Sequence, residues 1–268
     1  MKIGIIGIGF VGKALMDSFI QKNYILNDNL FVYDKYKSEY SSSFDTLLNT
    51  QILFLTLPTL YIDSEKKYDL AQLEETLDRL RAYTGLVIIK STVEPLTCLR
   101  FYAQYDLKII HNPEFLTART ALDDFNNQKH IILGTIPQCN YDNLLDNIYE
   151  FYKTNYPNAK ISICSITESE SVKLFLNCFY AVKVQFFTEI YLLCDKLNID
   201  YENVKTLMLN NGWINPMHTT IPGPDGNISY GGMCFPKDTN ALCNFMLNCD
   251  SPCAVLDATV KERNMMRE

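Results

Sequence analysis

The sequence of 268 residues lacks a long hydrophobic run, a CxxC pair and any excess of basic residues. No apolar stretch approaches the roughly 18 residues that a membrane-spanning helix needs. Lysine and arginine number 24 against 31 aspartates and glutamates, and the net charge of −7 disfavours nucleic-acid binding, which needs a basic face. The apolar N-terminal stretch is interrupted by glycines and no small-residue cleavage site follows, unlike a signal peptide. We therefore expect a cytoplasmic protein that binds neither membranes nor nucleic acid.

The nine cysteines form an odd number, and the chain is long enough to build a hydrophobic core without disulfides. We expect reduced thiols, most of them small core residues. The densest group runs from Cys234 to Cys253 but lacks the CxxC spacing that metal knuckles usually have. The sequence therefore predicts no metal site.

Short apolar runs alternate with helical patterns up to about residue 165. Most runs are rich in Ile, Leu, Val or Phe and bounded by polar, Gly or Pro residues, as buried parallel strands are. Strands are expected at 2–6, 30–33, 51–55, 86–89, 108–110, 130–133 and 160–163, and helices near 11–22, 69–82, 96–104 and 141–153. This order predicts an α/β fold, with a Rossmann-type, doubly wound parallel sheet over residues 1–165.

Residues 166–268 have a different, mainly helical pattern. A long helix is expected from Thr167 to about Leu197, opened by a capping box at Thr167–Glu170. Further helices are expected at 201–210, 239–249 and 252–267, with a Gly/Pro-rich loop at 211–237. We therefore predict an all-α second domain over residues 166–268.

The motif GIGFVG follows the first strand directly and opens a helix. In this context Gly7 makes the turn, Gly9 lets a pyrophosphate approach the backbone, and Gly12 allows close helix packing. The helix N-terminus adds a favourable field for the anion. The alternative is that the glycines only shape a turn in an α/β protein without a cofactor.

Asp34 ends the second strand, where a carboxylate accepts hydrogen bonds from ribose hydroxyls and repels a 2′-phosphate. The sequence therefore predicts NAD rather than NADP. The cofactor-binding residues predicted in this region are Gly7, Gly9, Phe10, Val11, Gly12 and Asp34.

The segment GGMCFPKD places Cys234 ahead of a helix that we expect to begin at Thr239. A thiol near a helix N-terminus and near Lys237 is expected to have a lowered pKa, which suits a nucleophile. In the alternative interpretation, Cys234 is a packed loop residue and Asp238 is the N-cap of the helix. That N-cap role for Asp238 is compatible with a functional one.

Lys173 and Asn177 are four residues apart on the long helix, so they share one face among apolar neighbours. A lysine on a largely buried helix needs a partner or a function, although the pair could also belong to a solvated stripe with Glu170. Thr92 and Glu114 follow two neighbouring strands, at the edge where open α/β sheets bind ligands. His111 precedes Glu114 and could carry a proton, but we expect a structural imidazole there.

Six motifs carry a resemblance to a known family. They are GIGFVG with Asp34, LPT at 57–59, KSTV at 90–93, NPEFL at 112–116, ESVKLFLN at 170–177 and GGMCFPKD at 231–238. In this order they resemble the UDP-glucose/GDP-mannose dehydrogenase family over essentially the whole chain, and above all its members that act on UDP-glucose. The resemblance implies NAD-dependent oxidation of a sugar C6 hydroxymethyl group to a carboxylate, with two NAD consumed per sugar.

The resemblance also implies roles for individual residues. Cys234 would form a thiohemiacetal and then a thioester, and Lys173 would stabilise the oxyanion with help from Asn177 and an ordered water. Asp238 would activate the hydrolytic water, and Glu114 would act as a general acid/base or polarise that water. Thr59, Thr92 and Lys237 match cofactor positions, Thr92 also counts among the catalytic residues, and the implied substrate-binding residues are Glu114, Phe115, Leu116, Lys173, Asn177, Tyr230 and Gly231.

Some features depart from the family pattern. Ala118 stands where the family usually has a second glutamate, Leu57 replaces a threonine, and no arginine occurs in the loop 211–237. The chain ends after the segment that resembles the family's central helix, so we expect it to lack the C-terminal UDP-binding domain. A separate chain could supply that domain, and the central helices suggest a homodimer.

Two alternatives to a nucleotide-sugar dehydrogenase stay open at this point. One is a single-step 3-hydroxyacid or 6-phosphogluconate-type dehydrogenase, which would release one NADH per substrate. The other is a catalytically inactive nucleotide-binding partner subunit. Within the leading hypothesis, UDP-N-acetylhexosamines and GDP-mannose remain alternatives to UDP-glucose.

Overall fold

The computed structural model describes residues 1–40 and 42–267, apart from the side chain of Ala118. The chain divides into two compact units. The first comprises Met1–Leu60 and Tyr68–Lys173, and the second comprises Tyr61–Lys67 and Leu174–Glu268. The division into domains at residues 165 and 166 stays a prediction.

The first unit contains a seven-stranded sheet with the order β2-β1-β3-β6-β7-β8-β9. Its strands are β1 (Ile3–Ile6), β2 (Leu30–Tyr33), β3 (Ile52–Leu55), β6 (Leu86–Ile89), β7 (Lys108–His111), β8 (His130–Thr135) and β9 (Lys160–Ser165). All seven expected strands are confirmed, with ends that differ from the prediction by at most two residues. In this order β1 lies between β2 and β3, which is typical of dinucleotide-binding sheets.

One strand pair departs from the parallel arrangement that the sequence predicted. Strands β7 and β8 pair in antiparallel register, with His111 opposite Gly134, whereas the other neighbouring pairs are parallel. The prediction of an entirely parallel sheet is therefore wrong at this pair. A strand buried on both faces has the same apolar composition in either direction, so composition does not reveal strand direction.

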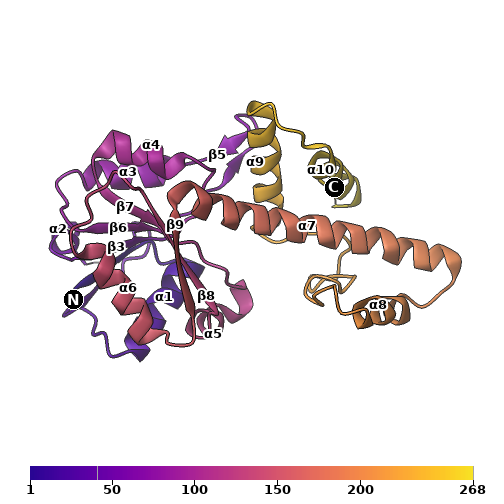
Figure 1. The fold of residues 1–268 in the computed structure, drawn as a ribbon, viewed down its shortest axis with the longest axis horizontal. Coiled ribbons are helices and arrows are strands. Elements are labelled where there is room, and N and C mark those ends of the chain that lie inside the picture. The colour runs from indigo at the N-terminus through magenta and orange to yellow at the C-terminus, as the bar shows by residue number, and fades with distance from the viewer. Residues whose placement is uncertain (41, 268) are drawn as a thin grey trace. The chain divides into compact units, whose positions relative to one another are not determined.

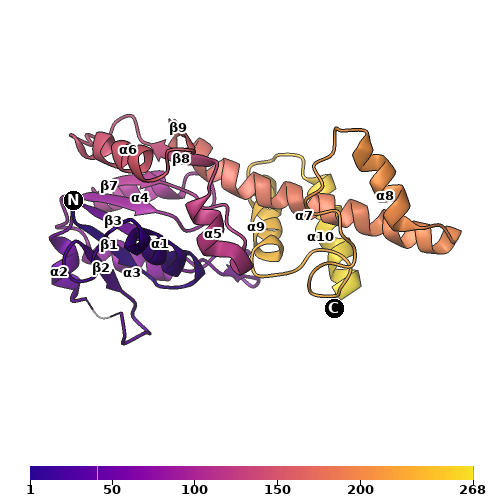
Figure 2. The same ribbon diagram turned by 90° about the horizontal axis from the view of Figure 1, so that it is seen from below.

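Both faces of the sheet are covered by helices, as Figures 1 and 2 show. Side chains alternate along each strand, so Ile3 and Ile5 pack in one core and Ile6 in the other. The first core includes residues of α1 (Phe10–Gln21), α5 (Ala121–Asn126) and α6 (Leu144–Asn155). The second includes residues of α2 (Phe44–Leu48), α3 (Ala71–Arg79) and α4 (Thr97–Tyr105). The doubly wound α/β fold is thereby confirmed.

Several short elements were not expected from the sequence. They are α2, α5, a 3-10 turn at Ala118–Thr120, and the two-stranded hairpin of β4 (Tyr61–Ile62) and β5 (Lys67–Tyr68). None is longer than six residues, and so short a segment has too few residues to show a periodic pattern of apolar side chains.

The second unit is mainly helical. Its helices are α7 (Ile166–Leu197), which begins in the first unit, α8 (Tyr201–Asn210), α9 (Phe235–Asn248) and α10 (Ala254–Arg267). Helix α8 and the end of α7 share a small core around Phe187, Cys194, Tyr201 and Ile221. No helix in the described part of the chain is long and apolar enough to cross a membrane.

The start of α7 differs from the expected capping box at Thr167–Glu170. The box is formed instead by Ser165 and Glu168: Ser165 N donates to Glu168 Oε2 at 2.8 Å, and Glu168 N donates to Ser165 Oγ at 3.3 Å. Glu170 is fully buried, and its two oxygens accept from the amides of Leu96 and Cys98 at 2.8 and 2.7 Å. Glu170 therefore holds the start of α4 rather than capping its own helix.

The start of α9 also differs from the prediction, because the helix begins at Phe235 and not at Thr239. Pro236 lies in the first turn, where its missing N–H costs no hydrogen bond and its fixed φ suits a helix. The amide of Asp238 donates to the carbonyl of Cys234 at 3.0 Å. Cys234 thus occupies the N-cap position, and the interpretation of Asp238 as the N-cap is wrong.

Candidate active site

The glycine-rich loop between β1 and α1 leaves space that side chains would fill. Gly7 has φ +92°, and a Cβ on Gly12 would lie only 2.0 Å from the carbonyl oxygen of Gly7. A Cβ on Gly9 would meet nothing within 4 Å. Gly7 and Gly12 are therefore required by the backbone itself, whereas Gly9 keeps an open approach to it.

Asp34 lies directly after β2 and faces this loop. Its Oδ2 accepts from the amide of Ile8 at 2.7 Å, and its Oδ1 accepts from the amide of Tyr36 at 2.9 Å. The N-cap of α1 is Gly9, which has no side chain to cap the helix, and the next residue, Phe10, is 62% exposed. An exposed helix N-terminus, an open glycine and a carboxylate at the strand end fit the pyrophosphate and ribose of a dinucleotide.

Replacing Asp34 with alanine is expected to shift cofactor preference from NAD towards NADP by about tenfold, because the carboxylate no longer accepts from ribose or repels a 2′-phosphate. The measurement is the ratio of the two dissociation constants by fluorescence titration. Asp45→Ala, an exposed carboxylate in α2, is the matched control. An unchanged ratio in Asp34→Ala would exclude the ribose contact.

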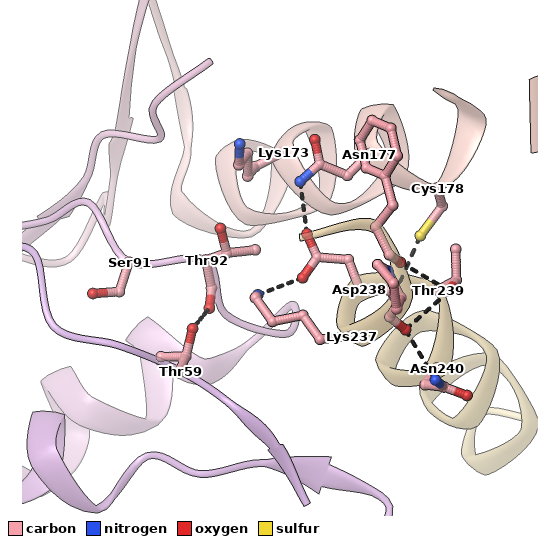
Figure 3. A network of polar contacts seen from close by, with 12 residues as sticks. Thr59, Ser91, Thr92, Lys173, Asn177, Cys178, Lys237, Asp238, Thr239 and Asn240 are labelled. Atoms are coloured by element: carbon pink, nitrogen blue, oxygen red, sulfur yellow. Dashed lines mark hydrogen bonds and ion pairs between the residues drawn. The ribbon is translucent and has the colours of Figure 1, made fainter. Parts of the chain in front are cut away.

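Two loops at the carboxyl ends of neighbouring strands are joined by hydroxyl groups. Thr59 Oγ1 donates to the carbonyl of Thr92 at 2.7 Å (Figure 3), and Ser91 Oγ donates to the carbonyl of Leu57 at 2.7 Å. The structure thus brings together Thr59 and Thr92, both predicted as cofactor contacts. Ser91 was missed, although it lies inside the KSTV motif.

His111 is fully buried at the end of β7, where its environment is that of a structural residue. Its Nδ1 lies 2.8 Å from Ser169 Oγ, and burial lowers the pKa of the imidazole to about 3. The neighbouring Lys90 is also buried and donates to the backbone and side-chain oxygens of Asn112 at 3.0 Å each. The expectation of a structural imidazole agrees with this environment.

The titration of His111 predicts a loss of stability in acid. Its pKa in the folded protein lies below the ordinary value of 6.5, so the unfolded chain takes up a proton first as the pH falls. The neutral ring's contribution to the free energy of unfolding is therefore present above pH 6.5 and falls by about 1.4 kcal/mol per pH unit below it. Relative to a His111→Asn variant, the wild type should lose its advantage between pH 6.5 and about 4.5 in chemical denaturation. A constant difference across this range would contradict the assignment.

Lys173 and Glu114 form a buried ion pair in the first unit. Lys173 Nζ lies 3.3 Å from Glu114 Oε1, and the two side chains are 5% and 12% exposed. The ring of Phe115 lies 5.4 Å from the same ammonium, and the amide of Leu116 donates to Glu114 Oε2 at 2.7 Å. The interpretation of Lys173 and Glu170 as a solvated stripe is therefore wrong. A buried cation so close to a carboxylate can stabilise negative charge on a bound molecule.

Asp238 is the centre of a second polar cluster, in the second unit (Figure 3). It is fully buried; its Oδ2 accepts from Asn177 Nδ2 at 2.6 Å, and its Oδ1 lies 2.5 Å from Lys237 Nζ. Cys178 Sγ donates to the carbonyl of Asp238 at 3.3 Å, and burial raises the pKa of this thiol. The cluster holds a carboxylate in the first turn of α9, where the helix dipole favours negative charge.

Cys234 differs from Cys178 in its surroundings. Cys234 is exposed at the N-cap of α9, one turn before Asp238, and the alternative of a packed loop residue is wrong. Tyr230 and Gly231, predicted as substrate contacts, precede it; Tyr230 is 2% exposed, with its hydroxyl 3.3 Å from Thr239 Oγ1.

None of the nine cysteines, all described, forms a disulfide, and no group of three His, Cys, Asp or Glu side chains among the described residues could hold a metal ion.

Comparison with known proteins identifies the family of this chain. Residues 23–153 match the NAD binding domain of the UDP-glucose/GDP-mannose dehydrogenase family, and residues 167–265 match the central domain of the same family. The chain belongs to this family. Its first unit therefore carries an NAD-binding domain, in agreement with the open glycine loop and Asp34, and NAD is its cofactor.

Individual relatives in the family are distant. The chain is 28% identical to the UDP-glucose 6-dehydrogenase of Rickettsia bellii (strain RML369-C), over 97% of this chain and 66% of the relative. It is similar in fold to a UDP-glucose dehydrogenase from Pyrobaculum islandicum (TM-score 0.82, 23% identity, 98% of this chain and 68% of that one). A UDP-D-ManNAc dehydrogenase from Pyrococcus horikoshii gives a TM-score of 0.81 at 18% identity, over 99% and 69% of the two chains. The chain thus spans slightly less than two thirds of the Rickettsia relative's length.

Proposed function

We propose that this chain oxidises the C6 hydroxymethyl group of a nucleotide sugar, with UDP-glucose the leading substrate, to a carboxylate. The observation that carries the proposal is the exposed thiol of Cys234 at the N-terminus of α9, one turn from the buried carboxylate of Asp238. Cys249 is exposed as well, but it lies at the C-terminus of α9, whereas Cys234 lies at the N-terminus, where the helix favours a thiolate. Membership of the dehydrogenase family supports the proposal.

The proposed reaction has two oxidations and a hydrolysis. The alcohol carbon first loses a hydride and its hydroxyl loses a proton, which gives an aldehyde. The Sγ of Cys234 then bonds to the aldehyde carbon as its S–H bond breaks, and the thiol's proton passes to the carbonyl oxygen, giving a thiohemiacetal. Loss of a second hydride and of that proton leaves a thioester, and water cleaves its C–S bond to release the acid and the thiol. NAD, when bound, supplies the hydride acceptor for each oxidation.

The residues of the two polar clusters would have separate roles in this reaction. We propose that Lys173, held by Glu114, stabilises the oxygen that becomes negatively charged, and that Asn177 assists from one turn along α7. Asp238, held by Asn177 and Lys237, would activate the hydrolytic water. Glu114 would act as a general acid/base, and Thr92 would contact the nicotinamide end of the cofactor.

The test is to count NADH released per acid formed, with a panel of UDP-glucose, UDP-N-acetylhexosamines and GDP-mannose. Two NADH per acid are expected for one of these sugars, with the acid measured by anion-exchange chromatography. One NADH per substrate, with an aldehyde or ketone as product, would indicate a single-step dehydrogenase instead. NAD binding without reduction with any of the sugars would indicate a nucleotide-binding partner subunit.

We further propose that the chain forms a homodimer through α7. Five large apolar side chains on this helix are 36 to 61% exposed: Val172, Phe175, Phe179, Phe186 and Leu193. Their spacing of 3, 4, 7 and 7 residues places them on one face of the helix. An apolar stripe of this length is costly in water, and a second copy of the helix can cover it.

A variant with Phe179→Glu and Phe186→Glu should be a monomer, because each glutamate would be buried without a partner in the proposed interface. Multi-angle light scattering should show about half the mass of the wild type. Asp195→Lys changes the charge of an exposed residue on the opposite face of the same helix and should leave the mass unchanged. A wild type that is monomeric at tens of micromolar would contradict the proposal.

A further inference from the structure

Arg267, at the end of α10, binds the segment that leads to Cys234. Its Nε donates to the carbonyl of Ile228 at 2.8 Å, and its Nη2 donates to the carbonyl of Ser229 at 2.7 Å. Its Nη1 lies 2.6 Å from Asp225 Oδ2, and the guanidinium keeps the pKa of that carboxyl below its usual range. The arginine side chain is only 13% exposed. One planar group therefore fixes three positions of a single loop, which a lysine could not do.

Gly231 is packed directly against this guanidinium. A Cβ on Gly231 would lie 2.2 Å from Arg267 Nη1 and 2.8 Å from its Cζ. The arginine could move aside only by giving up the hydrogen bonds that hold it to Asp225, Ile228 and Ser229. The contact gives Gly231 a structural reason to lack a side chain, separate from any contact with substrate.

The same segment is held from its other side by α7. The amide of Ser229 donates to Thr188 Oγ1 at 3.0 Å, and Ser229 Oγ donates to Gln185 Oε1 at 2.5 Å. Ser229 is 2% exposed and has φ +61°, which an L-residue adopts at a cost. The loop is therefore kept in an unfavourable conformation by two helices. Between this anchored segment and α9 lie Gly232, with φ +76°, and Met233, which is 72% exposed.

We infer that Arg267 is a positioning residue for Cys234: it fixes the 225–231 segment so that the thiol has one conformation at the start of α9. This inference rests on the proposed function where turnover is concerned. Without the arginine, Gly232 and Met233 would join Cys234 to a loop that is no longer held from α10. The thiol would then sample several positions, and only a fraction of them would be productive.

The test compares Arg267→Gln and Arg267→Lys with Lys261→Gln, an exposed site on the same helix whose ammonium pairs with Asp257. Arg267→Gln should raise hydrogen exchange of the amides at 226–232 by at least about tenfold. It should lower kcat by about tenfold or more while the KM for NAD stays within twofold, because the glycine-rich loop is untouched. Arg267→Lys should recover only part of the loss. Site-resolved alkylation of Cys234 should change severalfold, with exposed Cys249 as the internal reference.

A second variant separates the contact from a general effect on folding. Gly231→Ala should reproduce the Arg267→Gln exchange pattern, and the double variant should be no worse than either single one, because each breaks the same contact. Additive effects, or unchanged exchange and alkylation in Arg267→Gln, would overturn the inference. If the wild type oxidises none of the sugars, the proposed function fails, but the exchange, alkylation and double-variant results still decide the role of Arg267.

Discussion

Cys234→Ser should reduce acid formation by at least about 10³-fold, the largest effect expected of any substitution in this chain. Serine preserves the size and hydrogen-bonding capacity of the side chain at the N-cap of α9 but is far less ionised than a thiol at neutral pH. An oxygen ester would also be a poorer intermediate than a thioester, because the alkoxide is a worse leaving group. NADH production should therefore stop after no more than one equivalent per site.

The measurement is acid by chromatography together with NADH by absorbance, under single-turnover and steady-state conditions. Cys249→Ser is the matched control, because Cys249 is also exposed and lies at the other end of the same helix. It should retain wild-type rates. Acid formation by Cys234→Ser at the wild-type rate would remove the covalent mechanism, whatever the oligomeric state of the protein.

The strands and the glycine-rich loop could be predicted because their patterns are local. A buried strand such as β6 is a short apolar run, and GIGFVG with Asp34 specifies a turn, a helix start and a carboxylate within one βαβ unit. These features depend on neighbours in sequence. They predict NAD binding without any information on tertiary contacts.

The errors arose where distant contacts decide between equivalent local patterns. Both Ser165 with Glu168 and Thr167 with Glu170 fit the spacing of a capping box. The first pair forms the box because Glu170 is bound by the amides of Leu96 and Cys98, more than 70 residues away. Nothing near Glu170 in the sequence indicates this partner. The only available signal was an acidic side chain on the same helical stretch as a buried lysine.

The sequence predicts a helix start at Thr239 and not at Phe235, because Pro236 also fits a loop. Proline ends a helix when it lies inside one but favours the first turn, and the sequence alone did not decide between these cases. The true start of the helix matters for the proposed function, because the helix N-terminus lies at Cys234 and Asp238 lies one turn inside the helix. Arg267 could not have been predicted either, because its acceptors lie about 40 residues earlier in the chain.

Asp238→Asn should slow hydrolysis of the thioester by about 10²-fold or more while leaving both oxidations in place. Asparagine can still accept from Asn177 Nδ2 through its carbonyl oxygen, so the position of the side chain should be preserved. Its amide group, however, can neither take a proton from water nor pair with Lys237 Nζ, which lies 2.5 Å from the carboxylate. The first turnover should therefore release two NADH per site rapidly, followed by a slow steady state.

The acyl-enzyme intermediate should accumulate in this variant, so it can be detected directly. Intact-protein mass spectrometry should find Asp238→Asn with one acyl adduct, mapped to Cys234 by peptide analysis, whereas the wild type should show little. Asp257→Asn, which removes an exposed ion pair with Lys261, should show neither the burst nor the adduct. Losing the paired charge should also lower the free energy of unfolding by about 3 kcal/mol, because the Lys237 side chain is only 18% exposed. If Asp238→Asn lost the NADH burst as well, its charge would be needed before hydrolysis, and the step assigned to Asp238 would have to move to formation of the thioester.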